Sequence, residues 1–207
     1  YYEKVKQAYI KVYDRLGIGE NTYYAFASGG SFSKYSHEFQ TLSDVGEDTI
    51  FISREKKIAV NKEVLEDDIL AELGVKREEL EEVRAIEVGN IFGLGTKFSA
   101  PFDLSVTDEN GTKHTVIMGC YGIGVTRVMG TIAELMSDER GLVWPKNIAP
   151  YQLHITSLGN DEAVLADADK LYESCKSAGI EVLWDDRDVS AGEKLADADW
   201  MGRPIRG

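Results

Sequence analysis

Apolar side chains recur every three or four positions over the first sixteen residues, and Gly17 follows them. This spacing predicts a surface helix over residues 3–16, because one face of an α-helix repeats every 3.6 residues and glycine commonly ends it. Further on, the apolar positions fall in short runs separated by glycine and serine. These runs predict strands at residues 22–28, 36–42, 48–53 and 83–92, with two short acidic helices at 64–73 and 77–82.

A hairpin is predicted to follow these strands. Leu104 and Val106 alternate on one arm, Val116 and Met118 alternate on the other, and Asn110-Gly111 is a strong signal for a two-residue turn. The sheet at this point is therefore expected to be antiparallel. That expectation argues against a dinucleotide-binding βαβ unit, which is built on parallel strands.

The run MGCYGIGVTR at residues 118–127 carries the most specific chemistry. Gly122 and Gly124 lack side chains, so a flat ligand can lie against the backbone, and both residues permit positive φ. Arg127 falls on the first turn of a predicted helix, where the guanidinium and the helix dipole favour a phosphate or a purine ring. A packed turn with a surface arginine is the alternative, and a dinucleotide fingerprint would require glycine at the arginine position. The helix is predicted to reach about residue 137 and to pack an apolar face on a sheet, with Val125, Val128, Met129, Ile132, Leu135 and Met136 on that face.

Strands and helices alternate beyond Pro150. The predicted elements are strands at 153–158 and 180–184 and helices at 161–178 and 192–201. This alternation predicts a parallel sheet with right-handed crossovers, and a further strand is expected to begin where the chain ends. Two prolines and a charged start predict a linker at residues 138–150, which separates domains at residues 1–137 and 151–207.

Composition narrows the function classes. The chain has 207 residues and a net charge of −13, and no stretch approaches the length of a membrane span. Cys120 and Cys175 fall in different predicted domains without metal-ligand spacing, which argues against a disulfide framework or a zinc site and suits a reducing cytosol. No basic run points to nucleic acid, and we interpret the acidic segments at 63–82 and 161–169 as solvated helix faces.

The run VIMGCYGIGVTRVMGTIAE at residues 116–134 resembles the third signature motif of class II aminoacyl-tRNA synthetases, and most closely that of the bacterial prolyl-tRNA synthetases. Further stretches are similar to that family in the same order: SHEF (36–39) with GEDTI (46–50), EVGNIF (87–92) with LGTKFS (94–99), and WP (144–145) and IAP (148–150) with DDR (185–187) and GEKLADAD (192–199). The resemblance spans nearly the whole chain. Asn90 replaces a usual histidine and Gly93 a usual glutamine, which puts a contact to ATP in doubt.

The resemblance implies an α+β fold, with the C-terminal part of an antiparallel-sheet class II catalytic domain followed by a truncated three-layer α/β anticodon-binding domain. It implies that the full-length enzyme joins proline to tRNA(Pro) through a prolyl-adenylate, with ATP and Mg²⁺ and without zinc. A cytoplasmic homodimer that forms through an upstream segment, with no membrane partner, is also implied. The first two class II motifs are missing here, so these residues alone are expected to be inactive. The alternatives are another class II synthetase, or a catalytically dead paralogue that binds nucleotide or RNA.

The resemblance also assigns residues to the ATP site. Arg127 would cover the adenine or hold the γ-phosphate, and Gly122 and Gly124 would floor the nucleotide. Glu87 would be a Mg²⁺ ligand, because carboxylate oxygens suit that ion, and Thr96 would lie near the ribose or the phosphates. The alternatives are an exposed strand carboxylate for Glu87 and a turn hydroxyl for Thr96.

Two further sites follow from the resemblance. The proline pocket would be formed by His37, Glu38 and Cys120, with Glu38 binding the imino group and Cys120 lining the wall. Adjacent strand residues point to opposite faces, so at most one of the first two is expected to point directly into the pocket. The anticodon would be read by Asp186, Arg187, Glu193 and Lys194, for which a capping and salt-bridge cluster is the alternative.

Overall fold

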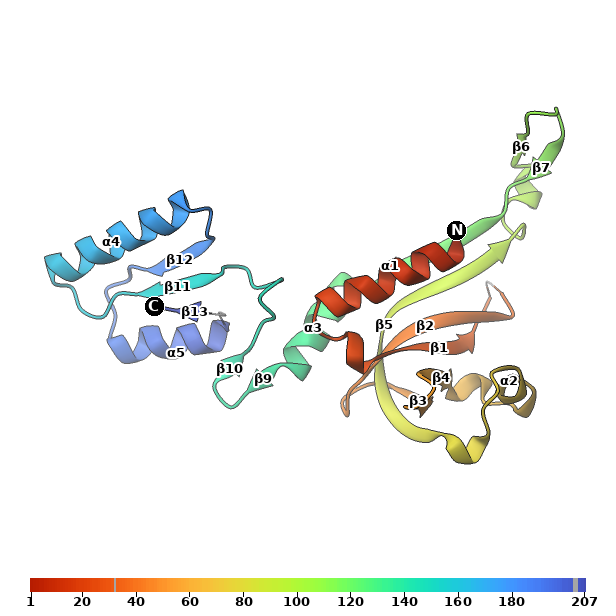
Figure 1. Ribbon diagram of the computed structural model, residues 1–207, viewed down its shortest axis with the longest axis horizontal. Helices are drawn as coiled ribbons and strands as arrows, with labels where there is room; N and C mark the ends of the chain where they lie inside the picture. The colour runs from red at the N-terminus through yellow and green to blue at the C-terminus, as the bar shows by residue number, and fades with distance from the viewer. Residues whose placement is uncertain (32, 203–204) are drawn as a thin grey trace. The chain divides into compact units, whose positions relative to one another are not determined.

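The computed structural model describes residues 1–31, 33–202 and 205–207 (Figure 1). The chain divides into two compact units, Tyr1–Thr131 (unit 1) and Ile132–Gly207 (unit 2). Unit 1 holds a mixed sheet and unit 2 a parallel one.

Unit 1 is built around a six-stranded sheet in the order β2-β1-β4-β3-β5-β8. Its strands are β1 (Thr22–Ser28), β2 (Tyr35–Leu42), β3 (Asp48–Ser53), β4 (Ile58–Asn61), β5 (Glu81–Gly95) and β8 (Met118–Ile123). Because β2 also pairs with β5, five of these strands close into a ring, and β8 pairs with the C-terminal half of β5. The antiparallel arrangement of β5 and β8 is confirmed, whereas β1 and β4 form a parallel pair that the sequence pattern does not indicate.

The other predicted elements of unit 1 differ in detail. The predicted strands at 22–28 and 48–53 match β1 and β3, but the pattern does not reveal β4, which is only four residues long. The acidic segment contains less helix than predicted: 3₁₀ turns η2 (Lys62–Val64) and η3 (Arg77–Glu79), and the short helix α2 (Asp67–Glu72). The predicted helix at 77–82 does not form beyond Glu79, because Glu81 and Glu82 belong to β5 and pair with β3. Sheet pairing thus overrides the local preference of these residues for a helix.

A bulge in β5 decides which of its residues share a face. Phe39 pairs with Gly89, but the next residue of β2, Gln40, pairs with Glu87, so Val88 is an extra residue in β5. In a regular strand, residues three apart lie on opposite faces. The extra residue instead places Glu87 and Asn90 on the same face.

Helix α1 (Tyr2–Arg15) covers the other face of this sheet (Figure 1). Its buried Tyr9 and Tyr13 pack on Phe39 of β2, with ring centroids 5.2 Å apart in both pairs. The predicted end of the helix is confirmed, because Leu16 is the C-cap and Gly17 adopts a φ of 79°.

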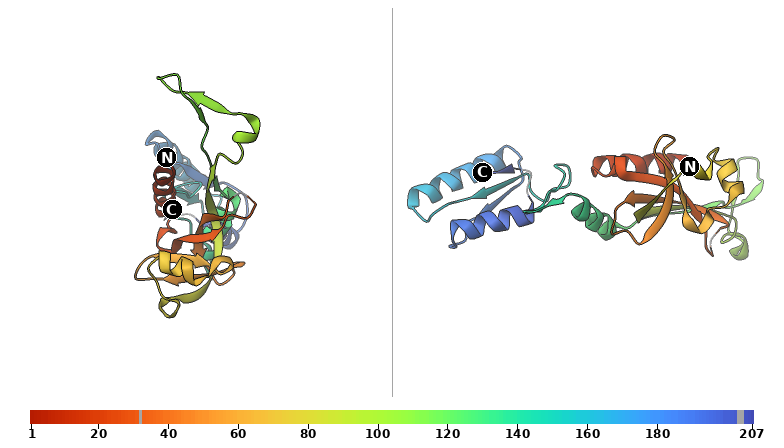
Figure 2. Two further views of the ribbon diagram at one scale, coloured as in Figure 1. Left: turned by 90° about the vertical axis from the view of Figure 1, so that its right-hand side faces the viewer. Right: turned by 90° about the horizontal axis from the view of Figure 1, so that it is seen from below.

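The predicted hairpin forms, but it does not run into the glycine turn. Its arms are β6 (Ser105–Thr107) and β7 (Lys113–Thr115), which extend from the unit as a separate two-stranded sheet after the 3₁₀ turn η4 (Ala100–Phe102) (Figures 1 and 2). Strand β8 then pairs with β5 instead of continuing the hairpin. The reason is that β5 offers a free edge along Gly89–Gly95, where β8 completes the main sheet.

Helix α3 (Val125–Leu135) follows the glycines as predicted, with two corrections. Val128 and Ile132 are buried, but Val125 and Met129 are exposed, so the buried stripe is narrower than the pattern of apolar residues. The preceding glycines Gly122 and Gly124 both have ordinary negative φ values, so their absent side chains provide space and not an unusual backbone turn.

Unit 2 is a parallel sheet with a helix on each side (Figure 1). A small hairpin, β9 (Ser137–Asp138) and β10 (Gly141–Leu142), precedes β11 (Leu153–Thr156), α4 (Glu162–Ser177), β12 (Val182–Asp185), α5 (Ala191–Met201) and β13 (Ile205–Arg206). The order β12-β11-β13 is parallel throughout, which confirms the predicted three-layer alternation. The last strand begins just before the end of the sequence, as expected. Ile155, Ala168 and Val182 form the core between α4 and the sheet.

Candidate functional site

Three acidic side chains from different strands share the face of the unit 1 sheet opposite α1. These are Glu38 of β2, Asp48 of β3 and Glu87 of β5, and we call this surface the carboxylate face. Gln40 shows that they are neighbours, because its side chain contacts both Glu38 and Asp48 and its backbone pairs with Glu87. Carboxylates that share one surface suit cationic ligands.

Arg127 reaches over this face from the first turn of α3. One of its guanidinium nitrogens lies 3.4 Å from Glu47 Oε1 and 3.9 Å from Glu87 Oε2, and it donates to the Glu87 carbonyl oxygen at 3.3 Å. The arginine side chain is 48% exposed, so part of it is available to a ligand. The structure therefore brings together Arg127 and Glu87, which the sequence had separated by forty positions.

The two glycines leave room beside these charges. Gly122 pairs with Asn90 of β5, and a Cβ at Gly122 would lie 3.2 Å from Asn90 Oδ1. A Cβ at Gly124 would lie 3.3 Å from the Cβ of Arg127. Gly122, Gly124, Glu87 and Arg127 thus form one local site, whose predicted role in nucleotide binding stays a prediction.

Asn90 has a clear contact in this site. Its amide nitrogen donates to Glu87 Oε1 at 3.1 Å, which orients the carboxylate. In the sequence, Asn90 stands out only as a residue that differs from the motif it resembles. The contact depends on the bulge at Val88, and no local sequence signal reveals it.

Glu38 is half-buried on the carboxylate face. Burial raises the pKa of its carboxyl to about 6, since desolvation disfavours the charged form, and nearby Glu87 and Asp48 act in the same direction. Hydrogen bonds from Gln40 and Asn61 oppose the shift by stabilising the carboxylate. The group is therefore poised to change protonation state close to neutral pH.

His37 lies on the opposite face, under α1. Its ring stacks on Tyr24 at 4.4 Å between centroids, and Tyr2 Oη lies 2.7 Å from Nδ1. Burial, followed by the charge of Lys6, lowers the pKa of His37 to about 4, so the ring is neutral at pH 7. Only Glu38 of the adjacent pair lies on the carboxylate face, and the predicted pocket role of His37 is not supported by this position.

Thr96 and Cys120 lie further along the β5–β8 pair. Cys120 is exposed and pairs with Phe92, on the same side of β8 as Gly122. Thr96 follows the end of β5, nine residues beyond Glu87, which is roughly 25 Å or more along an extended strand. The structure does not bring Thr96 to Arg127. Its carbonyl oxygen instead accepts hydrogen bonds within the turn that follows β5.

The carboxylate face can contribute to a cation site but does not form a complete one. Within residues 1–31, 33–202 and 205–207, no group of three or more histidine, cysteine, aspartate or glutamate side chains is arranged to hold a metal ion. Magnesium is commonly bound by one or two carboxylates together with the phosphates of a substrate. Glu87, with Oε1 fixed by Asn90, fits the part of a single protein ligand of that kind.

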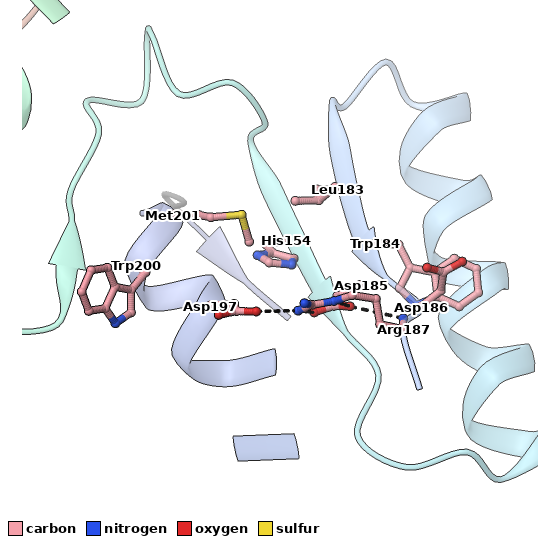
Figure 3. Close-up of a pocket in the computed structure, with 9 residues that line it drawn as sticks. All are labelled: His154, Leu183, Trp184, Asp185, Asp186, Arg187, Asp197, Trp200 and Met201. Atoms are coloured by element: carbon pink, nitrogen blue, oxygen red, sulfur yellow. Dashed lines mark hydrogen bonds and ion pairs between the residues drawn. The ribbon is translucent and has the colours of Figure 1, made fainter. Parts of the chain in front are cut away.

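A cavity of about 350 Å³ lies in unit 2 beside β12, and α5 and one residue of β11 also line it (Figure 3). It is lined by His154, Leu183, Trp184, Asp185, Asp186, Arg187, Asp197, Trp200 and Met201. Arg187 is held between Asp185 and Asp197, at 2.7 and 2.8 Å, and this pairing lowers the pKa of Asp185. Asp186 and Trp200 are exposed, so the cavity combines an aromatic surface with hydrogen-bonding groups that have fixed positions.

Lys194, unlike Asp186, is not exposed. Its side chain is buried with the residue 1% exposed, and its ammonium donates to Ser157 O, Ser157 Oγ and Asp185 O at 3.0 to 3.2 Å. These bonds tie the ends of β11 and β12 to α5. The predicted base-reading role of Lys194 is wrong for this arrangement, because the ammonium is already surrounded by acceptors. Glu193, one residue earlier, is exposed on the first turn of α5.

Replacing Lys194 with methionine is expected to lower the free energy of unfolding of unit 2 by about 2–3 kcal/mol, because buried acceptors lose their donor. All three tryptophans of the chain lie in unit 2, at positions 144, 184 and 200, so urea unfolding followed by tryptophan fluorescence reports on this unit. Lys170→Met on the exposed side of α4 is the control. Equal midpoints for the two variants would contradict the structural role.

Each of the two units matches a known protein family. The family described as "tRNA synthetase class II core domain (G, H, P, S and T)" matches residues 1–136, and the family "Anticodon binding domain" matches residues 152–207. The chain belongs to the class II tRNA synthetase core family and carries an anticodon-binding domain after it. The predicted α+β fold class is thereby confirmed. No helix in the described part of the chain is both long enough and apolar enough to cross a bilayer.

Curated relatives point to one member of that family. Proteins named "Proline--tRNA ligase" are similar to this chain in Bacillus subtilis (strain 168), 50% identical over 122 residues, and in Persephonella marina, 46% identical over 133 residues. These matches cover 58% and 64% of this chain, and 22% and 24% of the two relatives. The matched part of the chain thus corresponds to about a quarter of the length of these relatives. The predicted resemblance to bacterial prolyl-tRNA synthetases is confirmed.

Proposed function

We propose that this chain is part of a longer class II enzyme that ligates proline to tRNA(Pro), with ATP as the energy source and a prolyl-adenylate as the intermediate. The observation that carries the proposal is the grouping of Arg127, Glu87 and Gly122 in one site of a class II core whose curated relatives are proline–tRNA ligases. The alternatives are that the enzyme is another class II synthetase, or that the protein binds a nucleotide or RNA without catalysing a reaction.

In the first step, the carboxylate of proline attacks the α-phosphate of ATP, the bond between the α-phosphorus and the bridging oxygen to the β-phosphate breaks, and prolyl-adenylate and pyrophosphate form. Negative charge builds up on the phosphates in this step. Arg127 has a half-exposed guanidinium above the glycines, where it binds a phosphate or stacks on the adenine. Asn90 holds Glu87 in place to ligate Mg²⁺, which when bound neutralises phosphate charge. These residues position and neutralise the reacting groups, which is the main requirement of phosphoryl chemistry.

For proline, the carboxylate face supplies Glu38. Its carboxylate binds the secondary ammonium of the substrate, and Cys120 lines the apolar wall nearby on β8. A small apolar amino acid needs a pocket with only one or two polar anchors, which this arrangement supplies.

For tRNA, we assign base reading to Asp186 and Arg187, which line the cavity of unit 2, and to the exposed Glu193 on the first turn of α5. Carboxylates accept hydrogen bonds from guanine amino groups, arginine donates to guanine oxygen and nitrogen acceptors, and an exposed tryptophan such as Trp200 offers a surface for stacking. A homodimeric assembly and a cytoplasmic location belong to the same proposal. The division of the chain into domains at residues 1–137 and 151–207, with a linker at residues 138–150, is also part of this proposal.

The test is pyrophosphate exchange into ATP by the full-length protein that contains this chain. We expect exchange that depends on proline and on Mg²⁺, and none with alanine, glycine or threonine at the same concentration. Exchange with a different amino acid would favour another class II synthetase. ATP binding without exchange for any amino acid would favour the binding module and refute the proposal.

A further inference from the structure

Gln40 occupies an unusual position on the carboxylate face. The residue is 0% exposed, and its Nε2 donates to Glu38 Oε2 at 2.9 Å and to Asp48 Oδ2 at 2.6 Å. A side-chain amide has two N–H donors, so each carboxylate receives one of them. The orientation of the amide is fixed, because its carbonyl oxygen in place of Nε2 would face two carboxylates.

This contact determines the direction of the Glu38 carboxylate. Oε2 accepts from Gln40 and also from Asn61 Nδ2 at 3.2 Å. In the described part of the chain, no residue donates a hydrogen bond to the other oxygen, Oε1. One oxygen of Glu38 is thus held by two amides, and the second is left for a ligand.

Packing alone does not explain an amide at this position. Within the described residues, Gln40 Oε1 is buried without a hydrogen-bond partner, which costs stability. A methionine has nearly the same shape and would fill the space without that cost. The benefit of glutamine lies in its two bonds to carboxylates that belong to different strands.

We infer that Gln40 is a positioning residue, which links Glu38 to Asp48 and directs Glu38 Oε1 toward the secondary ammonium of the substrate amino acid. This inference rests on the proposed function. Asp48, on the neighbouring strand β3, is then the fixed anchor of the Gln40 amide.

The charges around Glu38 predict how loss of Gln40 affects its titration. Glu38 is faced by Asp48 on β3 and Glu87 on β5, which raise its pKa, and by the amides of Gln40 and Asn61, which lower it. Without the donor of Gln40, the pKa of Glu38 rises further above about 6. Less of the carboxylate form is then present at pH 6–7, so proline binding requires a higher pH.

The variant Gln40→Met in the full-length protein tests this inference. At pH 7 we expect the KM for proline to rise about tenfold with kcat changed by less than about threefold, since hydrogen bonds to charged groups contribute at this level. The acid limb of kcat/KM for proline should move to higher pH, and the KM for ATP should stay the same. Thr41→Val is the matched control, because Thr41 is the next residue of β2, is also 0% exposed and loses one hydrogen bond, to Thr22.

A second variant keeps the test independent of folding at Gln40. Asp48→Ala, at the partly exposed start of β3, removes the anchor of Gln40, and we expect a smaller rise in the KM for proline without loss of kcat. Thermal unfolding identifies any variant that has lost its fold. An unchanged KM for proline and an unchanged acid limb in folded Gln40→Met would overturn the positioning role alone. Absence of proline-dependent exchange in the wild-type protein would overturn the proposed function, and the inference with it.

Discussion

Proline-dependent pyrophosphate exchange by the full-length protein is expected to fall about 10²- to 10³-fold when Arg127 is replaced with alanine. Loss of one preorganised charge donor at a site of developing negative charge has an effect of this size. Arg127 lies over Glu87 and beside the glycines, and its guanidinium is 3.4 Å from Glu47 and 3.9 Å from Glu87. Exchange kinetics at varied ATP and proline concentrations measure the effect.

The control for this prediction is Arg54→Ala. Arg54 makes a closer ion pair, 2.7 Å from Glu81, but it lies at the exposed end of β3 and away from the glycines. We expect exchange by this variant within twofold of wild type. If Arg127→Ala retained more than a tenth of the wild-type rate, the assignment of the phosphate or adenine contact to Arg127 would be wrong.

Replacing Gly89 with alanine is expected to destabilise unit 1 by about 3 kcal/mol. A Cβ at Gly89 would lie 2.4 Å from Tyr13 Oη and 2.9 Å from the Gly122 carbonyl oxygen, so α1 or β8 must shift. Tyr13 is fully buried against Phe39 and cannot move without opening the core, which places the cost at the upper end for overpacking. Urea unfolding followed by circular dichroism measures the loss.

Gly93→Ala on the same strand is the matched control. Among the described residues, no atom lies within 4 Å of a Cβ at Gly93, and its φ is not positive. We therefore expect Gly93→Ala to unfold like wild type. Because tryptophan fluorescence reports only on unit 2, its transition should be the same in both variants. Equal stability of the two glycine variants would show that the contact between α1 and β5 is loose.

The sequence predicted most elements of the fold, because their patterns are local. Helices α1, α4 and α5 and strands β1, β3 and β12 follow from apolar spacing and from glycine or capping residues at their ends. What the pattern does not contain are the pairings between distant strands. The parallel partner of β1 and the strand character of Glu81 both depend on such pairings.

The candidate site was predictable in part for the same reason. Gly122, Gly124 and Arg127 lie within six residues, so their proximity follows from a strand and a helix turn. It was also predictable that the side chains of His37 and Glu38, which are adjacent on a strand, point to opposite faces of the sheet. The contact of Asn90 with Glu87 could not be predicted, because it needs the extra residue Val88 in β5. The burial of Lys194 could not be predicted either, because its acceptors, Ser157 and Asp185, are distant in the sequence.

The closed ring of strands also has a consequence for how the polypeptide acquires its structure. Closure requires β2 to find β5, and the paired residues Leu42 and Ala85 or His37 and Ile91 are more than forty positions apart. Folding slows as the sequence separation between paired residues increases, because the entropy of closing the intervening loop must be lost before the contacts form. Until β2 meets β5, the strand edges of the N-terminal unit are unpaired, and they are then vulnerable to association with other copies of the chain.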